Sequence, residues 1–378
     1  MSKLISLCMI VKNEENVLAR CLETVKRFVD EIIIVDTGST DRTLHVAQHY
    51  TTKIYSYKWN NDFSAARNEA LKYATGKWIF VLDADEYADE TNMMALRRFL
   101  ENETPRADTL YQINIVNFLG DSSGASTSEQ PVIRIFSNHL GIYYFRPIHE
   151  QPVIPSGFQP RLVNLPIQVL HSGYTTDVMN AKNKHQRNLG IFQAMEEGDG
   201  LSPYDQSMLG KQFLLMNELQ KAKHHLEVAF RQGDPKSQWY TFNLTALLET
   251  YLKLNEGIVA WNFVEQQLKD YSRHSDILCI KGIIAAMLGF DKEAKHFFHS
   301  AIEEAEQRAK KQQDVALVST TYAFQIPLWE LAQIYEREYN YTNAIYYLIQ
   351  LVQLNHKEIK VLKKLMHILS LRDHSESI

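Results

Sequence analysis

The chain has 378 residues, of which 45% are hydrophobic and 22% are charged, and its formal net charge is −5. Because a single hydrophobic core rarely grows beyond about 250 residues, this length predicts two domains. The composition excludes a disordered or collagen-like protein. The negative net charge is not that of a protein that binds nucleic-acid phosphates, so we expect no nucleic-acid partner.

The cysteines, Cys8, Cys21 and Cys279, lie far apart in the sequence. They form no Cys-x-x-Cys pair, which argues against a disulfide framework and a structural zinc site and favours a reducing compartment. The first apolar stretch, residues 4–11, is too short to cross a membrane, and no cleavage site follows it. We therefore expect a cytoplasmic protein without a stable membrane anchor.

The first part of the chain alternates short apolar runs with amphipathic segments. Runs rich in valine and isoleucine predict strands, and apolar residues at helical spacing predict helices. This alternation is typical of an α/β fold with a mainly parallel sheet, in which ligands bind beyond the carboxyl ends of the strands. The expected strands lie at 4–11, 31–36, 53–57 and 78–83, and the expected helices at 14–28, 40–50 and 64–74.

The pattern changes after the fourth of these strands. Shorter segments follow at 109–118 and 132–136, and the polar segment rich in small residues between them, 120–130, is expected to be a loop. An acidic segment with glycine and proline, 196–203, indicates a domain boundary. We therefore predict an α/β domain at 1–198.

The remainder, 199–378, has an almost wholly helical pattern. Similar pieces recur in it, and each contains an alanine at which two helices would cross closely: Ala222, Ala294 and Ala344. The irregular spacing of these pieces is near the roughly 34 residues of a tetratricopeptide repeat. The sequence predicts an all-α, tetratricopeptide-like domain of three or four helix pairs.

Two aspartates follow the fourth predicted strand, in the sequence VLDADEY at 81–87. Because side chains of an extended chain repeat every two residues, Asp83 and Asp85 point to the same side, with the small Ala84 between them. Two carboxylates on one face suit a hard divalent cation that keeps positions open for phosphate oxygens. Alternatively, both aspartates only cap the following turn.

Asp36 and Arg67 are further candidates. Asp36 ends the second predicted strand, where its carboxylate can bond a base or a ribose, although a capped strand–helix turn also explains much of this segment. Arg67 lies on a predicted helix and either suits a diphosphate or pairs with a structural aspartate. The sequence contains no phosphate loop of the P-loop type, no Gly-x-Gly-x-x-Gly and no Ser-His-Asp arrangement. The usual kinase, dehydrogenase and hydrolase classes are therefore excluded.

Several segments together resemble the family-2 glycosyltransferases of GT-A fold. The helical part is similar to the tetratricopeptide-type domain of one subgroup, and the arrangement of both is similar to that of the bacteriocin (sublancin-type) peptide S-glycosyltransferases. The resemblance covers roughly 1–190 with specific motifs and the remainder only in architecture. The motifs are IVKNEE (10–15), VDTGSTDRT (35–43), NDFSAARN (61–68), WIFVLDADE (78–86) and IHE (148–150).

This resemblance implies a site for a UDP-sugar and a divalent cation. Asp85 would bind Mg²⁺ or Mn²⁺, and a histidine late in the domain, His171, would complete the shell of metal ligands. Asp83 would contact the nucleoside or assist the metal. The residues implied to line the nucleotide are Ile10 and Val11 through their main chain, Glu14, Asp36, Arg67, Asp83 and Ala84.

A base for the acceptor is expected in FRPIHEQP (145–152), where His149 precedes Glu150. An inverting transfer needs one base on the acceptor side, and either side chain can titrate. The resemblance favours Glu150, because the family usually has a carboxylate there, and His149 remains the alternative. Lys184 belongs to a basic cluster that would screen the departing UDP or form a solvated helix face. The cluster is Lys182, Lys184, His185 and Arg187.

Together these features predict a metal-dependent, inverting glycosyltransferase that moves a hexose, with glucose favoured, from a UDP-sugar. The resemblance implies a peptide acceptor, with Cys or Ser of a bacteriocin precursor as the modified residue, and a homodimer formed through the helical domain. The alternatives are transfer to a cell-surface polysaccharide or glycolipid, a non-catalytic helical-repeat scaffold, and a nucleotidyltransferase.

Overall fold

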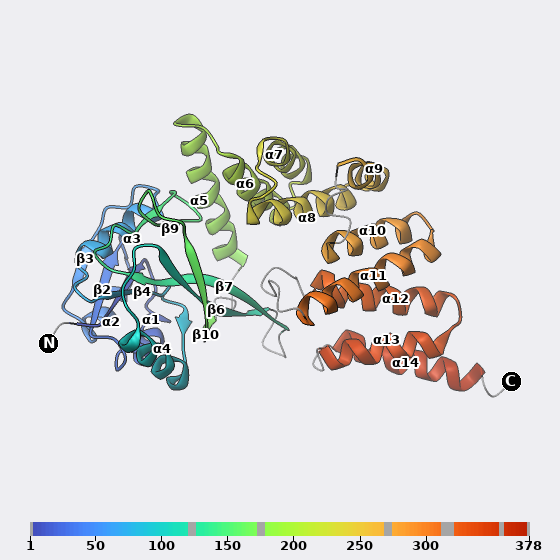
Figure 1. The fold of residues 1–378 in the computed structure, drawn as a ribbon, viewed down its shortest axis with the longest axis horizontal. Helices are drawn as coiled ribbons and strands as arrows, with labels where there is room; N and C mark the ends of the chain where they lie inside the picture. Colours follow the sequence, from blue (N-terminus) through green and yellow to red (C-terminus); the bar gives the residue numbers. More distant parts are fainter. Residues whose placement is uncertain are drawn as a thin grey trace. The chain divides into compact units, whose positions relative to one another are not determined.

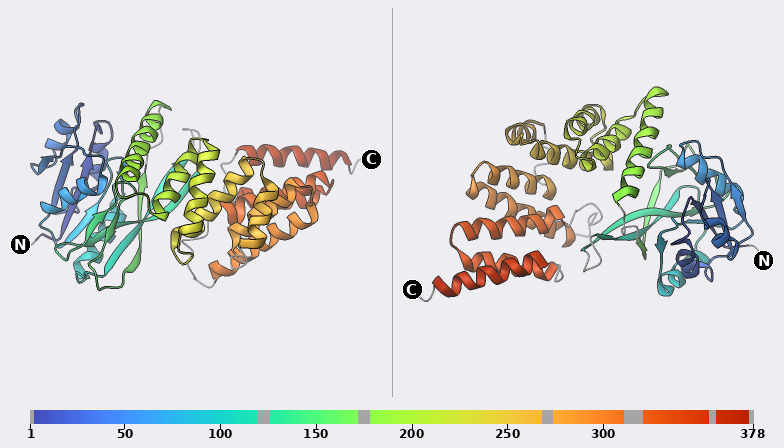
Figure 2. Two further views of the ribbon diagram at one scale, coloured as in Figure 1. Left: turned by 90° about the horizontal axis from the view of Figure 1, so that it is seen from above. Right: turned by 180° about the vertical axis from the view of Figure 1, so that it is seen from behind.

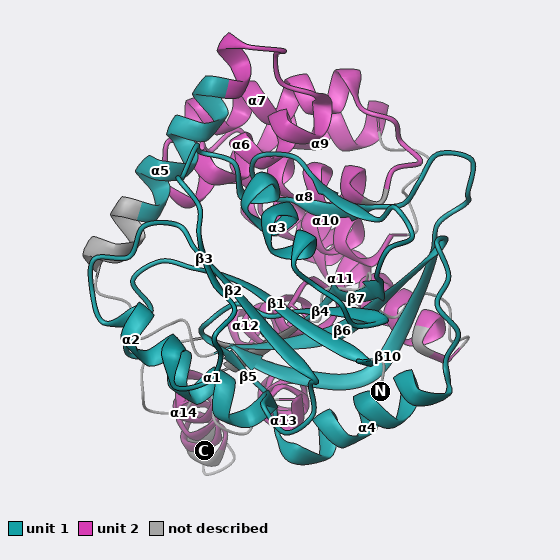
Figure 3. Cartoon of the chain, turned by 90° about the vertical axis from the view of Figure 1, so that its left-hand side faces the viewer, with its two compact units in different colours: residues 1–194 teal, residues 195–378 magenta. Residues whose placement is uncertain are grey.

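The computed structural model describes residues 3–119, 126–171, 178–267, 274–310, 321–354 and 359–375. The chain divides into two compact units, Met1–Ala194 and Met195–Ile378 (Figure 3). The dividing point lies inside helix α5 (Val178–Glu197), slightly before the boundary that the sequence predicts after residue 198. The first unit carries a GT-A-like mixed sheet, and the second is helical.

The first unit is built on one eight-stranded sheet, ordered β3-β2-β1-β4-β7-β6-β10-β5 (Figure 1). The strands from β3 to β4 are parallel, whereas β7 runs antiparallel to both of its neighbours. A separate pair joins β8 (Tyr143–Phe145) to β9 (Gln151–Val153). The strands of the sheet are β1 (Ile5–Val11), β2 (Glu31–Asp36), β3 (Ile54–Ser56), β4 (Trp78–Val81), β5 (Glu86–Tyr87), β6 (Thr109–Leu119), β7 (Ser126–Ser137) and β10 (Arg161–His171).

The alternation of side chains along β1 creates a core on each face of the sheet. Leu7 and Met9 belong to one cluster, which also holds the buried residues of α1 and α4. Cys8 belongs to the other, with Ala70 of α3, and burial raises the pKa of its thiol. Strands buried on both faces explain the continuous apolar runs of the sequence. The helices of this unit before α5 are α1 (Leu18–Val25), α2 (Thr43–Gln48), α3 (Phe63–Lys72) and α4 (Glu90–Asn102).

The four parallel strands and three helices predicted near the N-terminus are confirmed, although each helix is shorter than its amphipathic pattern. The predicted loop at 120–130 is wrong in part. Residues 126–130 form the start of β7 and pair with β6, while 120–125 lie outside the described residues. The prediction failed because the polar residues of this segment rarely occur in strands. Backbone hydrogen bonds to β6 nevertheless hold it as a strand.

The second unit consists of successive helices that pack against their neighbours, as α6 does with α7, α10 with α11, and α12 with α13 (Figure 2). Ser202 begins the first of them with a capping box, in which its side chain and that of Asp205 each bond the other's backbone N–H. The helices are α6 (Pro203–Leu215), α7 (Leu219–Gln232), α8 (Gln238–Lys253), α9 (Gly257–Gln267), α10 (Ser275–Met287), α11 (Asp291–Lys310), α12 (Ile326–Arg337), α13 (Tyr341–Leu354) and α14 (Ile359–Ser375), with a π-helical turn η3 (Thr321–Gln325) before α12.

The repeat-like packing agrees with the tetratricopeptide-like prediction. Ala222, Ala294 and Ala344 are each fully buried, which confirms that small side chains occupy these helix contacts. The side chains that surround Ala294 come from α10, α11 and α12, and those around Ala344 from α12, α13 and α14. No helix in the described ranges is long and apolar enough to cross a membrane.

Candidate functional site

The carboxyl ends of the parallel strands bring several of the predicted site residues to one edge of the sheet. Val11, the last residue of β1, pairs with Asp36, the last residue of β2. Cys8 of β1 pairs with Val81, the last residue of β4, so Asp83 follows at the same edge. This edge is the place at which ligands bind in open α/β sheets.

Two arginines hold Asp83. Arg67 Nη2 donates to Asp83 Oδ1 at 2.9 Å, and Arg134 Nη2 donates to Asp83 Oδ2 at 2.8 Å. Arg67 comes from α3 and Arg134 from β7, and both are buried. Desolvation would raise the pKa of Asp83, but the charges of Arg134 and Arg67 outweigh it and hold this pKa well below its usual range.

A second carboxylate, the buried Glu86, extends this network. Arg134 Nη2 also donates to Glu86 Oε1, and Glu86 Oε2 accepts from the backbone N–H of Asp83 at 2.9 Å. Glu86 lies at the start of β5 and is 3% exposed. Arg134 therefore bridges two carboxylates, as a buried guanidinium must to offset the loss of its hydration.

Glu150 joins the same network through Nε of Arg67. Arg67 Nε donates to Glu150 Oε1 at 2.7 Å, and the Glu150 side chain is 14% exposed. The segment before it is sharply turned, because Arg146 and His149 have φ angles of 84° and 53°, and the backbone N–H of Phe63 donates to the carbonyl of Pro147 at 2.8 Å. This bond ties the segment to the start of α3, the helix that carries Arg67.

His149 and Glu150 face different surroundings. The His149 ring lies 6.1 Å from the ring of Phe192 on α5, measured between centroids, whereas Glu150 is paired with Arg67. Glu150 is thus joined by a direct hydrogen bond to the group that also holds Asp83.

Asp85 and His171 form a separate pair. Asp85 Oδ2 lies 3.0 Å from His171 Nε2, and His171 Nδ1 lies 2.8 Å from Asn117 Oδ1. The strand register explains this contact, since His171 of β10 pairs with both Glu86 of β5 and Asn117 of β6. The hydrogen bond to Asp85 raises the pKa of His171.

The donor atoms of this pair fit a divalent cation. A carboxylate oxygen and an imidazole nitrogen face each other, both side chains are partly exposed, and Asn117 can fix the orientation of the ring. Among the described residues, no group of three or more His, Cys, Asp or Glu side chains is arranged to hold a metal ion. Two protein ligands suit Mg²⁺, which usually takes further ligands from water and substrate phosphates.

Glu14 and Asp36 lie at the same edge of the sheet and differ in their surroundings. Burial and the charge of Asp85 raise the pKa of Glu14 to about 7, and Lys184 opposes this rise. Asp36 Oδ2 accepts from the backbone N–H groups of Gly38 and Ser39, both at 3.1 Å. Asp36 therefore caps the turn that follows it, and it also ends β2 at the ligand-binding edge.

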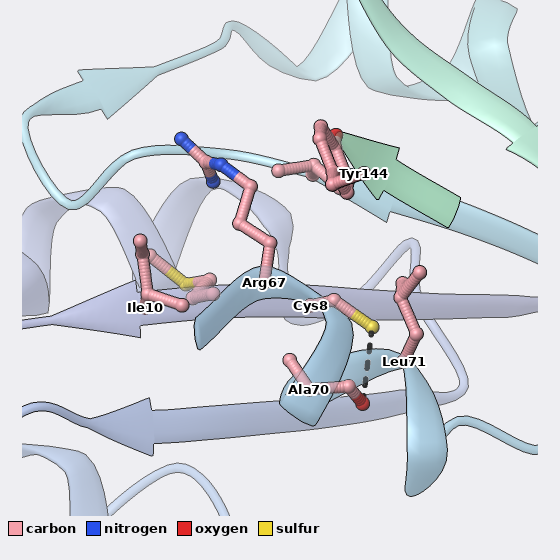
Figure 4. Close-up of a pocket in the computed structure, with 8 residues that line it drawn as sticks. Cys8, Ile10, Arg67, Ala70, Leu71 and Tyr144 are labelled. Atoms are coloured by element: carbon pink, nitrogen blue, oxygen red, sulfur yellow. Dashed lines mark hydrogen bonds between the residues drawn. The ribbon is translucent and has the colours of Figure 1, made fainter. Parts of the chain in front are cut away.

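The other predicted contacts are placed less specifically. Ile10 and Val11 end β1, and Ala84 is buried between the two aspartates. Lys184 is exposed on α5, and the side chain of Lys182 lies outside the described residues. Figure 4 shows Arg67 extending from α3 between Ile10 and Tyr144, and Cys8 is another of the residues that line this pocket. The Cys8 thiol contacts the carbonyl of Ala70 there, at 3.9 Å.

Sequence reasoning missed Arg134, Glu86 and Asn117. One signal was available for Arg134: it is the single charged residue of the run VIRIF at 132–136. A charge inside an apolar strand needs a buried partner, which directs attention to carboxylates on neighbouring strands. No local pattern in the sequence indicates Asn117, which lies beside His171 because β6 pairs with β10.

The comparisons with known proteins agree with this architecture. Residues 6–130 match the family model for Glycosyl transferase family 2. A TPR repeat-containing protein of Synechococcus elongatus is 34% identical over 245 residues, which are 61% of this chain and 58% of that protein. The SPbeta prophage-derived glycosyltransferase SunS of Bacillus subtilis is 29% identical over 227 residues, 58% of this chain and 51% of that protein.

Among solved structures, TarS of S. aureus aligns with a TM-score of 0.38 and 14% identity, over 72% of this chain and 56% of that chain. The chain spans between half and two thirds of the length of the curated relatives described above. The family match confirms the resemblance predicted from the motifs. The N-terminal unit is therefore a family-2 glycosyltransferase domain of GT-A type, and a tetratricopeptide-like helical unit follows it in the chain.

Proposed function

We propose that this protein is a metal-dependent, inverting glycosyltransferase that moves a hexose from a UDP-sugar to a peptide side chain. One observation carries the proposal: Arg67 joins Asp83 to Glu150 at the ligand-binding edge of a family-2 domain. The Arg67 guanidinium would stabilise the diphosphate, and the Glu150 carboxylate would serve the acceptor. Both belong to one hydrogen-bonded group.

The donor would bind across the carboxyl ends of β1, β2 and β4. Arg67 supports this placement, because its buried Nη1 has no hydrogen-bond acceptor among the described residues. A buried, unpaired guanidinium nitrogen is costly, and an oxygen of the donor diphosphate or sugar would satisfy it. Asp36, Glu14 and the main chain at the end of β1 would surround the uridine.

Asp85 and His171 would hold Mg²⁺ or Mn²⁺ at this site. When bound, the cation supplies Lewis-acid stabilisation to the leaving diphosphate. Asp85 lies in the turn before β5 and His171 lies on β10, at the side of the sheet opposite β3.

Glu150 is the proposed base. In a single displacement, the acceptor atom bonds to the anomeric carbon, the bond from that carbon to the diphosphate oxygen breaks, and the acceptor proton passes to a Glu150 oxygen. Arg67 Nε holds Oε1, so Oε2 is the oxygen to which we assign the proton. His149, which faces Phe192, is the alternative base.

The acceptor follows from the relatives and the second unit. SunS is described as a glycosyltransferase and is 29% identical over 227 residues, and helical repeats present extended surfaces suited to peptides. We propose a bacteriocin-type precursor peptide as acceptor, modified at Cys or Ser, with glucose as the sugar. A homodimer through the helical unit is part of the same proposal.

The test uses the full chain with Mn²⁺, a panel of UDP-hexoses, and Cys- and Ser-containing peptides. Release of UDP together with a hexose mass increment on the peptide supports the proposal. Asp85→Asn is the matched variant, since it changes one oxygen to an amide and should abolish metal-dependent turnover. Absence of UDP release and of peptide modification with every donor would reject it, and pyrophosphate release from nucleoside triphosphates would instead indicate a nucleotidyltransferase.

A further inference from the structure

We propose that Arg134 is a positioning residue: together with Glu86 it fixes the carboxylate of Asp83, and thereby the direction in which Arg67 presents its free nitrogen to the donor. This inference rests on the proposed function and names a residue of the same site that the motifs of the family-2 domain do not include.

Each carboxylate oxygen of Asp83 accepts a hydrogen bond from an arginine. Arg67 occupies Oδ1 at 2.9 Å and Arg134 occupies Oδ2 at 2.8 Å. These two contacts fix the position of the Asp83 carboxylate, whose side chain is 38% exposed. Its main contact is with the two guanidinium groups, so we assign it the task of orienting Arg67.

Two carboxylates also orient the guanidinium plane of Arg67. Nε is bonded to Glu150 and Nη2 to Asp83, so two carboxylates from different parts of the chain hold one edge of a rigid, planar group. The remaining nitrogen, Nη1, is buried without an acceptor in the described structure and has one fixed direction. A shift of Asp83 would turn this plane and move Nη1.

Arg134 is poorly explained as a stabilising group. It lies in the apolar run of β7, it is 7% exposed, and its Nε is buried without an acceptor in the described ranges. Replacing a buried ionic group by a well-packed apolar one is often neutral or stabilising. Burying Arg134 costs free energy, and this cost is explained if Arg134 holds Asp83 beside Glu86. Without Arg134, the two carboxylates would repel each other.

Stability and activity should respond differently to substitutions of Arg134 and Glu86. Arg134→Met alone leaves Asp83 and Glu86 close together without their shared cation, so the variant should unfold at a lower temperature. The double variant Arg134→Met with Glu86→Gln removes that repulsion and should recover most of the stability. It should not recover activity, because Asp83 Oδ2 still lacks its partner and Arg67 is no longer fixed. Arg134→Lys keeps one charge and should retain an intermediate activity.

The experiment compares these variants in the full chain by thermal unfolding, by kcat and KM for the UDP-sugar, and by crystal structures. The expected loss in kcat for the double variant is roughly 100-fold, the scale expected when a reacting group is displaced by about 1 Å, with a smaller change in KM since Arg134 does not touch the donor. In its crystal structure, the Asp83 and Arg67 side chains should have moved.

Glu31→Gln is the matched control. Glu31 is a buried carboxylate held by Lys3 and Lys53, but it begins β2, at the opposite end of the strand from Asp36. The Glu31→Gln substitution should lower the unfolding temperature and leave kcat and KM unchanged. Wild-type kcat in the double variant, or unmoved Asp83 and Arg67 side chains in its crystal structure, would overturn the positioning role. Should the wild type release no UDP, the proposed function fails, and the crystal structures still decide the positioning role.

Discussion

Asp85 Oδ2 and His171 Nε2 lie 3.0 Å apart although 86 positions separate the two residues in the sequence. The contact is made by the pairing of β5 with β10, which sets His171 opposite Glu86, the neighbour of Asp85. The carboxylate, from the turn before β5, and the imidazole, from β10, form a preorganised pair of ligands, with the imidazole also bonded to Asn117.

The first prediction is that this pair determines metal affinity. Asp85→Asn and His171→Ala should each abolish most Mn²⁺ binding, whereas Asn117→Ala should weaken it by about 10–100-fold through a loosened imidazole. Calorimetric titration of Mn²⁺ into the protein with UDP measures this. His49→Ala, which removes an exposed histidine of the same unit, is the control and should bind as the wild type does. Equal binding by wild type and His171→Ala would contradict the assignment.

The second prediction separates the two candidate bases. Glu150→Gln should lower kcat by about 10²–10⁴-fold, the usual contribution of a general base, because Gln keeps the shape and the contact to Arg67 but accepts no proton. His149→Gln should lower kcat much less, since the His149 ring faces Phe192. Rates with saturating donor and acceptor give the comparison. A greater loss for His149→Gln would transfer the role of base to His149.

The sequence predicts the parallel half of the sheet because local patterns determine it. Apolar runs bounded by turns identify β1, β2 and β4, and the rule that ligands bind at the carboxyl edge then places Asp36 and Asp83 near each other. The tetratricopeptide-like part is equally local, since buried alanines such as Ala294 mark where helices cross.

The antiparallel half is different, because its contacts depend on register. Arg134 reaches Asp83 because β7 runs against β4, with Phe80 opposite Ile135, and no local pattern in VIRIF specifies that neighbour. The polar start of β7 was predicted as a loop for the same reason: its pairing partner, β6, supplies the strand preference that its own residues lack. His171 was identified through the family resemblance, and its partner Asn117 only by the structure.

The third prediction concerns stability at the opposite end of β2. Desolvation would raise the pKa of Glu31, but hydrogen bonds from Lys3, Lys53 and Ser6 hold it well below the ordinary value of 4.5. A lowered pKa in the folded state means that Glu31 contributes stability above its ordinary pKa and loses that contribution as the pH falls through the folded-state value.

Glu31→Gln should therefore destabilise the protein by about 1–3 kcal/mol near neutral pH, because buried donors lose a charged acceptor. The difference from the wild type should shrink steadily as the pH falls below about 4.5. Urea unfolding at a series of pH values measures it. Glu23→Gln removes an exposed carboxylate paired only with surface groups and should have little effect. A difference that grows on acidification would contradict this account.

The fourth prediction concerns Glu14, whose ionisation should lower the stability of the protein. Because the pKa of Glu14 is raised to about 7, its ionisation opposes folding once the pH exceeds its ordinary pKa, and the full cost is reached above pH 7. Glu14→Gln should thus stabilise the protein at pH 8 and have no effect on stability below about pH 4.5. Thermal unfolding in EDTA tests this without interference from a bound cation. Lower stability of the variant at pH 8 would show that the Glu14 charge is compensated.

The last prediction concerns packing in the helical unit. A Cβ added at Gly282 of α10 would lie 2.5 Å from Cε1 and 2.6 Å from Cδ1 of the fully buried Phe298 on α11. Gly282→Ala should therefore destabilise this helix pair by about 1–3 kcal/mol from overpacking, even though alanine favours a helix by about 0.5–1 kcal/mol over glycine.

Hydrogen exchange of the α10 and α11 backbone amides in the full chain reports this locally, without assuming that both units unfold together. Gly257→Ala is the control, since no atom lies within 4 Å of the added Cβ at the start of α9. Phe298→Leu combined with Gly282→Ala should slow exchange relative to Gly282→Ala alone, because the smaller side chain relieves the clash with the new methyl group. Exchange in Gly282→Ala as slow as in the wild type would mean that Phe298 has room to move, and the close approach of the two helices would then not depend on glycine.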